Sequence, residues 1–269
     1  MSGAVSLSTM LAVLAAVVLA GLLLDYLAII RRPWRPGLIL ALGGFGLGLG
    51  LTLCAVLPGS QVFGPVAVGR PLTEKVVALT FDDGPYPPYT GQVLDILREN
   101  RTVATFFLIG ANVVKYPELV RRIAAEGHQL GNHTYNHSDL LKLGREQIAD
   151  ETDRAGTVIA AIAGERPHVI RPPHGFRDPL VLDVLERQGL RVIEWSVASR
   201  DWTNPGTDAI VGRTLKEVKS GSIILLHDGD GVEAAAPRMQ TVEAVGRIIR
   251  HLKAEGYRFV TVDELLGNH

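Results

Sequence analysis

The chain divides into two stretches whose hydrophobic positions follow different patterns. In the first 57 residues the apolar pattern is continuous, because no charged side chain occurs from Ser2 to Leu24 or from Gly37 to Leu57. A helix of about 20 apolar residues is long enough to cross the roughly 30 Å hydrocarbon core of a bilayer. Residues 1–57 therefore predict two transmembrane helices, at about residues 2–30 and 37–57.

The connector between these two runs, residues 31–36, contains three arginines in the sequence RRPWRP. Cationic loops of membrane proteins lie in the cytoplasm. We therefore expect a cell-membrane protein with two spans in the lipid bilayer and with everything after about Pro58 outside the cytoplasm. A cleaved signal peptide is the alternative for the first run, but such a peptide begins with positive charge, and no Lys or Arg precedes Arg31.

From about Glu74 onward, short β-branched and aromatic runs alternate with longer stretches of helical periodicity. Residues 58–73 are rich in Gly and Pro and predict a linker, so the expected divisions are 1–57, 58–73 and a catalytic domain at 74–269. Such alternation is typical of parallel β/α units, and about 200 residues of them predict one closed or nearly closed α/β barrel. The predicted strands are Val76–Phe81, Thr105–Ile109, Gln129–Asn132, His168–Ile170, Arg191–Trp195, Ser222–Leu226 and Arg258–Val260. The predicted helices are Thr90–Asn100, Pro117–Glu126, Arg145–Ala163, Pro179–Gln188, Asp208–Lys219 and Arg238–Glu255.

Composition narrows the chemistry further. The 27 Lys and Arg residues nearly balance 28 Asp and Glu residues, which argues against a nucleic-acid partner, since such proteins present a basic surface. The single cysteine, Cys54, excludes an intramolecular disulfide and a Cys-ligated zinc ribbon. Any metal ion must therefore be held by histidines and carboxylates. The sequence carries no signal for an oligomeric state.

Ionisable residues follow five of the predicted strands, at the end where the chemistry of β/α barrels occurs. Each group has an ordinary explanation by itself: adjacent aspartates before Gly-Pro initiate turns, two histidines four residues apart occur by chance on helices, and an arginine forms ion pairs. These separate explanations do not account for the occurrence of all five groups at strand ends. The five groups are Asp82-Asp83, His133 with His137, Arg171 with His174, Asp201-Trp202, and His227.

Two imidazoles and one carboxylate form a three-ligand set that leaves a position open, as in catalytic zinc sites. If one of the two adjacent aspartates binds the metal, the other can act as a general base. His227 can protonate a leaving group, and Asp201 would keep it cationic, while Arg171 would keep the basic aspartate ionised. These parts together predict metal-assisted hydrolysis of an amide or ester.

The same residues, in this order, resemble the five motifs of the NodB-like polysaccharide deacetylases, a carbohydrate esterase family. The resemblance covers about residues 74–263 and rests on the runs Thr80–Pro85, Gly131–His137, Arg171–Gly175, Asp201-Trp202 and Ile224–His227. It implies a distorted (β/α)7 barrel, the NodB homology domain, that removes N- or O-acetyl groups from an acetylated polysaccharide.

Carried over to this chain, the resemblance implies that Asp82 is the general base, oriented by Arg171. The general acid would be His227, tuned by Asp201. The remaining roles are a divalent metal site, usually for zinc or cobalt, formed by Asp83, His133 and His137; an oxyanion contact from the backbone N–H of His174; and an acetyl pocket shaped by Trp202 and Leu225. Two positions depart from the family pattern: His174, where Tyr or Phe is commoner, and Ala198, where many relatives have Asp.

The expected function is therefore that of a membrane-anchored, metal-dependent polysaccharide deacetylase that hydrolyses N-acetyl groups of a cell-wall glycan, with peptidoglycan or chitin-like amino sugars favoured. Three alternatives stay open. The chain could be a non-catalytic, membrane-tethered glycan-binding relative, an O-acetyl esterase acting on another polysaccharide, or, with inverted topology, a cytoplasmic hydrolase of a small amide or ester.

Overall fold

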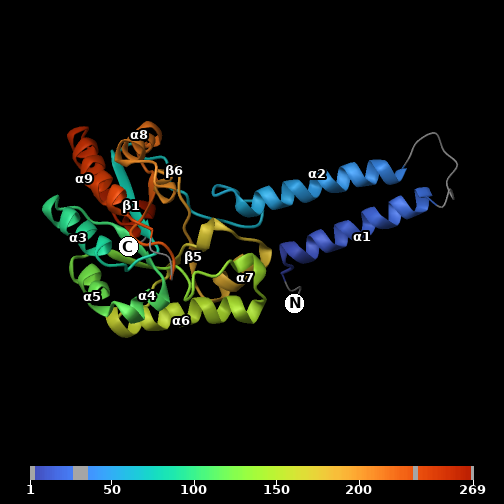
Figure 1. Ribbon diagram of the computed structural model, residues 1–269, viewed down its shortest axis with the longest axis horizontal. Helices are drawn as coiled ribbons and strands as arrows, with labels where there is room; N and C mark the ends of the chain where they lie inside the picture. Colours follow the sequence, from blue (N-terminus) through green and yellow to red (C-terminus); the bar gives the residue numbers. More distant parts are fainter. Residues whose placement is uncertain (1–3, 27–35, 233–235, 268–269) are drawn as a thin grey trace.

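In the computed structural model, which describes residues 4–26, 36–232 and 236–267, the strands form one parallel sheet that curls around a buried core (Figure 1). The hydrogen-bonded order is β5-β4-β3-β2-β1-β7-β6, with β8 beside the first half of β1. Every residue of β1 is buried, as expected for a central parallel strand covered on both faces. The strands are β1 Val76–Asp82, β2 Thr105–Leu108, β3 Gln129–Asn132, β4 Val169–Ile170, β5 Arg191–Val192, β6 Val197–Ala198, β7 Ile223–His227 and β8 Arg258–Val260.

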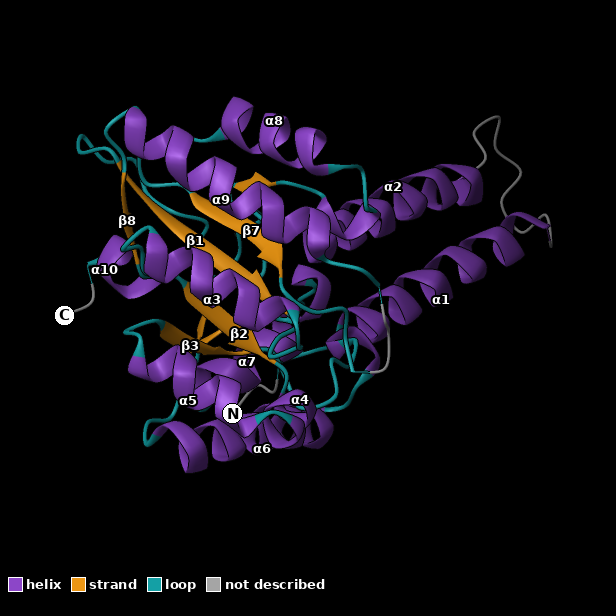
Figure 2. Ribbon diagram, turned by 60° about the vertical axis from the view of Figure 1, so that its left-hand side comes forward, coloured by secondary structure: helices purple, strands orange, loops and turns teal. Residues whose placement is uncertain are grey.

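Helices cover the outside of this sheet (Figure 2). The largest apolar cluster lies between the strands β1, β2 and β7 and the helices α3, α5 and α9. The helices that pack on this sheet are α3 Tyr89–Glu99, α4 Gly110–Lys115, α5 Pro117–Ala125, α6 Arg145–Ala163, α7 Pro179–Arg187, α8 Thr207–Glu217, α9 Met239–Ala254 and α10 Val262–Leu266. Three short 3₁₀ turns, η1 Leu140–Lys142, η2 Pro173–Gly175 and η3 Asp201–Thr203, follow β3, β4 and β6.

The predicted alternation of parallel strands and helices is confirmed, but closure of the ring is not. The strands β5 and β6 stand at opposite edges of the described sheet, so the domain is a parallel half-barrel. The predicted strand 191–195 stops at Val192, and the chain then resumes as β6, which was not predicted. At two residues β6 is too short to show an alternating pattern.

Residues 58–73, predicted as a linker, run along the sheet for part of their length. The N–H of Ala67 donates to the carbonyl of Val192 at 3.0 Å, and the carbonyl of Ala67 accepts from Glu194 at 2.8 Å. Farther on, the N–H of Arg70 donates to Gly221 at 3.1 Å. This segment therefore forms backbone hydrogen bonds with β5 and with the turn that precedes β7.

The two apolar runs form an antiparallel helical hairpin, α1 Leu7–Tyr26 and α2 Pro36–Val56, which projects from the half-barrel (Figure 1). A Cβ added at Gly44 would lie 2.4 Å from the Val18 side chain, so the helices pack closely where α2 has glycine. Among the described residues one helix is long and apolar enough to cross a membrane, Gly37–Val56, with mean hydropathy 2.1; the apolar part of α1, Leu7–Leu23, is shorter. The expectation of two spans is therefore not confirmed, and all but the last residue of the arginine-containing connector lies outside the described residues.

Candidate functional site

The predicted site residues gather around one cavity of about 450 Å³ at the carboxyl ends of the strands. This volume is within the usual range of ligand pockets, about 300–1,000 Å³. Two of the predicted residues, Arg171 and Asp201, lie behind the wall, and each is bonded to a residue that lines the cavity. The lining residues are Asp82, Asp83, His133, His137, His174, Phe176, Trp195, Trp202, Leu225, His227, Asp230, Gly231 and Arg238.

Asp82, the last residue of β1, is held by Arg171. The guanidinium donates to the Asp82 carboxylate at 2.7 Å, and neither side chain is more than 5% exposed. The same guanidinium donates to the hydroxyl of Thr80 and to the carbonyls of Ile193 and Glu194. Arg171 is therefore fixed by the sheet itself, and it holds the Asp82 carboxylate in one orientation.

Asp83 turns in the opposite direction, toward two histidines. Its backbone is in the left-handed region (φ 74°), which separates its side chain from that of Asp82. Asp83 Oδ1 lies 3.4 Å from His133 Nε2 and 3.2 Å from His137 Nε2, and this oxygen has no hydrogen-bond partner within the described structure. These three residues form a candidate metal site, with all three ligand atoms within 4.8 Å of one another.

The two histidines do not share a helix face. They lie in the loop after β3, and His137 is itself in the left-handed region, with φ 59°. The loop is fixed from outside by Glu151 of α6, whose carboxylate accepts from the backbone N–H groups of Tyr135 and Asn136 and from the Asn136 amide. Glu151 was not predicted, and its only sequence signal is a lone carboxylate in an amphipathic helix. Non-glycine residues with a left-handed backbone, such as His137, cluster at functional sites.

The protonation states of this cluster suit metal ligation. His133 Nδ1 lies 2.6 Å from the carbonyl of Arg171, so Nδ1 carries the proton and Nε2 is free to ligate. Burial lowers the pKa of His137 to about 4 and His133 adds to this effect, which makes the imidazole neutral at pH 7. Burial acts to raise the pKa of Asp83, but the close approach of His133 Nε2 and the charge of His227 bring that pKa below its usual range.

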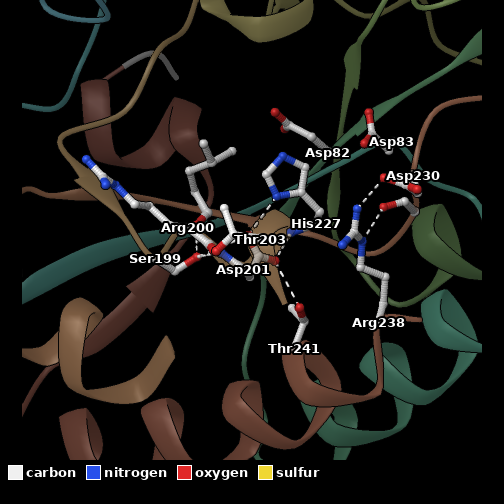
Figure 3. Close-up of polar contacts among 12 residues, drawn as sticks. Asp82, Asp83, Ser199, Arg200, Asp201, Thr203, His227, Asp230, Arg238 and Thr241 are labelled. Atoms are coloured by element: carbon white, nitrogen blue, oxygen red, sulfur yellow. Dashed lines mark hydrogen bonds and ion pairs between the residues drawn. The ribbon is translucent and has the colours of Figure 1, made fainter. Parts of the chain in front are cut away.

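His227, at the end of β7, is paired with the buried Asp201 (Figure 3). His227 Nδ1 and Asp201 Oδ1 are 2.8 Å apart, and the other carboxylate oxygen accepts from the His227 N–H at 2.8 Å and from the Thr241 hydroxyl at 2.9 Å. Burial acts to lower the pKa of His227, but the charge of Asp201 and this hydrogen bond raise it to about 9. The imidazole is therefore protonated at neutral pH and presents Nε2 toward the cavity.

The remaining predicted residues complete the wall. The ring of His174 lies 5.1 Å from that of His137, and its backbone is left-handed, with φ 61°. Trp202 packs edge-on against His227 at 5.4 Å between ring centroids and is 42% exposed, whereas Leu225 is buried beneath the cavity. Ala198, the second departure from the family pattern, pairs with Leu225 in the sheet.

The loops after β1 and β7 approach each other closely enough to require glycine. A Cβ at Gly84 would lie 2.4 Å from the Asp228 carboxylate, and one at Gly229 would lie 2.4 Å from the Asp83 carbonyl oxygen. Asp228 is buried, accepts from the hydroxyl of Thr90 at 2.5 Å, and has a pKa raised by burial to about 7. It was not given a role from the sequence, although it directly follows His227. It supports the turn that carries Asp83.

A second residue that sequence reasoning missed is Glu194. It is fully buried below the η2 turn, and neither carboxylate oxygen has a hydrogen-bond partner within the described structure. The nearest cation is Arg177, at 3.7 Å. Burial raises the pKa of Glu194 to about 8, so the side chain is largely neutral at pH 7. No local pattern marks this glutamate, because it lies in an irregular segment between β5 and β6.

Comparison with known proteins agrees with this geometry. The family model described as polysaccharide deacetylase matches residues 69–193. The chain is 43% identical over 198 residues to a peptidoglycan-N-acetylglucosamine deacetylase of Bacillus cereus, a match that spans 73% of this chain and 90% of the relative. It is also 44% identical over 187 residues to a chitooligosaccharide deacetylase of Sinorhizobium fredii, across 67% of this chain and 87% of the relative.

The fold gives the same result. The crystal structure of a peptidoglycan N-acetylglucosamine deacetylase bound to an N-hydroxybenzamide superposes with a TM-score of 0.70 at 37% identity and covers 74% of this chain and 92% of the other. The resemblance found in the sequence motifs is thereby confirmed. The chain belongs to the polysaccharide deacetylase family.

Proposed function

We propose that this protein is a membrane-anchored, metal-dependent polysaccharide N-deacetylase acting on amino sugars of a cell-wall glycan, of the peptidoglycan or chitin type. One observation carries the proposal. A paired carboxylate, Asp82, and a protonated imidazole, His227, face the same cavity as the Asp83, His133 and His137 cluster. Hydrolysis of an amide needs this combination of base, acid and charge stabilisation.

The donor set fits a divalent ion of the zinc type. One carboxylate oxygen and two imidazole nitrogens converge, and the unpartnered, buried Asp83 Oδ1 is costly unless a cation is its partner. When bound, such an ion supplies Lewis acidity that lowers the pKa of water and polarises a carbonyl oxygen. We assign zinc as the native ion because neutral imidazoles with one carboxylate are its common ligands, and cobalt is a substitute.

Asp82 supplies the base. Arg171 holds one of its carboxylate oxygens in a buried site, and the second carboxylate oxygen is left to accept the proton of the attacking water. The pair also fixes the direction of proton transfer, because the guanidinium is itself held by three further acceptors. A positioned base contributes about 10²–10⁴-fold to such a reaction.

His227 supplies the acid. The leaving group of an N-acetyl sugar is an amine, which departs only after protonation, and His227 carries a proton at neutral pH because of Asp201. The backbone N–H of His174 is the proposed donor to the oxygen that becomes negatively charged on attack, a contact worth about 2.7–4 kcal/mol in other hydrolases. The acetyl methyl group would lie against Leu225 and Trp202, which form the apolar part of the wall.

The choice of N-acetylated amino sugars rests on the relatives, which are a peptidoglycan-N-acetylglucosamine deacetylase and a chitooligosaccharide deacetylase. The choice of a membrane anchor rests on α2, an apolar helix of sufficient length whose apolar stretch is only 6% buried within the protein. The helix α1 packs along α2 and would span with it or insert partly. The arginines of the connector support a cytoplasmic position for this part of the sequence.

The proposal is tested with the full-length protein in detergent, supplied with zinc and given chitooligosaccharide, peptidoglycan or acetylated xylan. Acetate and free amine are measured together, since equal amounts of both identify N-deacetylation, whereas acetate alone identifies an esterase. Asp82→Asn is the matched control and should lose at least about 100-fold in rate. Zinc binding to a folded protein that releases acetate from none of these glycans would support the non-catalytic alternative. A reporter fused after His269 tests the orientation, and a cytoplasmic signal would contradict it.

A further inference from the structure

The end of the hairpin nearest the half-barrel is bound by two consecutive charged residues, which follow the η2 turn and Phe176. The guanidinium of Arg177, 1% exposed, donates to the carbonyls of Leu57, Pro58 and Ser60 at 2.8–3.1 Å and to Gly175 at 2.7 Å. The carboxylate of Asp178 accepts from the N–H of Leu7 at 2.7 Å. We call Arg177 and Asp178 the hairpin clamp.

The signs of these charges match the helix ends that they meet. Arg177 lies at the carboxyl end of α2, where unpaired carbonyls concentrate negative charge, and Asp178 lies at the amino end of α1, where free N–H groups concentrate positive charge. Asp178 also caps α7 through the N–H of Val181. The clamp therefore binds both ends of the hairpin from one loop, which makes hairpin and half-barrel a single body.

This attachment sets the distance between the apolar helices and the active site. Arg177 contacts the residue that follows the end of α2, and it is three residues away from His174, a span of at most about 10 Å. If residues 58–73 were a free linker, the site could instead move roughly 50 Å from the hairpin. The polar zone of a bilayer is only about 5–8 Å thick on each side, so the clamp holds the cavity near the membrane surface.

Three apolar side chains of the half-barrel are exposed in or beside the segments that follow its strands. In the described part of the catalytic domain they are Val114, Trp202 and Met239, exposed by 54%, 42% and 41%. Trp202 lines the cavity, Met239 follows the cavity residue Arg238, and Val114 lies in α4, which follows β2. The strands β1 and β7 point toward the side from which the hairpin projects (Figure 2). Apolar side chains at this face would otherwise contact only water.

We infer that the face of the half-barrel at the carboxyl ends of its strands rests on the extracytoplasmic surface of the membrane that holds the hairpin. We infer further that the substrate is an N-acetylated amino sugar covalently attached to a lipid of that membrane. This inference rests on the proposed function, both the deacetylation and the membrane anchor. It adds that the accessible glycan is the portion within a few sugars of the lipid. A glycan held far from the bilayer would not reach the cavity while the contacts of the hairpin clamp are formed.

A spacer series tests the inference. The full-length protein is reconstituted in vesicles that contain chitotetraose linked to phosphatidylethanolamine, either directly or through a long polyethylene glycol spacer, and the rate on soluble chitotetraose is measured in detergent. We expect the directly linked sugar to react at least about tenfold faster than the spaced one. Arg177→Gln and Asp178→Asn should reduce this ratio severalfold. Asparagine can still cap α7, so the second variant keeps that helix start while removing the charge.

The readout is the ratio between two substrates for one variant, so a general loss of activity does not imitate it. Equal rates on the two lipids, or faster reaction of the spaced one, together with normal turnover of soluble chitotetraose would overturn the inference and leave the proposed deacetylase intact. A wild-type preference that persists unchanged in both clamp variants would show that the clamp does not set it. Absence of turnover on soluble sugar would contradict the proposed deacetylation, and release of the protein from membranes by carbonate would contradict the proposed membrane anchor. Either result would also overturn the inference.

Discussion

Replacing Asp201 by Asn tests whether the pairing with His227 keeps the proposed acid protonated. The Asp201 carboxylate is buried and accepts four hydrogen bonds, from the Ser199 hydroxyl, the Thr241 hydroxyl and both the ring and the backbone N–H of His227. Asparagine has nearly the same shape but no charge. The substitution therefore removes the main influence that raises the pKa of His227.

The expected size follows from that pKa. At about 9 the imidazole is about 97% protonated at pH 7.5; if the pKa returns to its ordinary value of 6.5, the protonated share falls to about 9%. We therefore expect about a tenfold loss of kcat/KM at pH 7.5 and a shift of the alkaline limb of the profile from near pH 9 toward pH 6.5. Activity should recover partly at pH 6, where the variant imidazole is again charged.

The assay is acetate release from chitotetraose across pH 5.5–10, with zinc content measured for each protein. Thr241→Val is the control, because it removes one hydrogen bond from Asp201 without removing charge, and its alkaline limb should stay near pH 9. An alkaline limb in Asp201→Asn that coincides with the wild-type limb would refute the role of this pair, even if the rate were lower throughout.

Three further outcomes follow from the site. Removal of metal by a chelator should abolish acetate release and zinc or cobalt should restore it, whereas His137→Ala should resist restoration at the same metal concentration. Arg171→Met should lower the free energy of unfolding by about 3–5 kcal/mol, because Asp82 is left as a buried, unpaired charge; retention of wild-type stability in denaturant titrations would contradict this. Glu194 binds its proton more tightly when folded, so its contribution to stability is present below pH 4.5 and is lost as pH rises through about 8, at up to roughly 1.4 kcal/mol per pH unit. Glu194→Gln should remove that dependence, as measured by thermal unfolding at pH 5 and pH 9.

Some helices and strands with a clear local sequence pattern were predicted with their correct bounds. The helix Arg145–Ala163 and the strands Gln129–Asn132 and Arg258–Val260 have the predicted bounds, since each has clear periodicity and turn-forming neighbours. The helix α4 was missed because its six residues make less than two turns. The two-residue strand β6 is defined by pairing with β7, which no local sequence signal encodes.

The residues of the candidate site that lie at the ends of strands could be predicted from the sequence. Asp82, His133 and His227 each end or follow a buried strand, so their convergence follows from parallel topology. The supports were not predictable. Glu151 acts across the space between α6 and the β3 loop, and Arg177 meets carbonyls about 120 positions earlier in the chain. Such contacts depend on tertiary packing, and the interpretation of residues 58–73 as a simple linker overlooked them for this reason.

The central claim, that base, acid and metal ligands act together on an N-acetyl group, is tested most directly by one measurement. Full-length protein in detergent is incubated with chitotetraose before and after complete removal of metal, and acetate and new free amine are counted in the same samples. We expect equal amounts of both products with zinc present and neither product without it. Equal deacetylation by the metal-free protein, or acetate release with no new amine, would contradict the account.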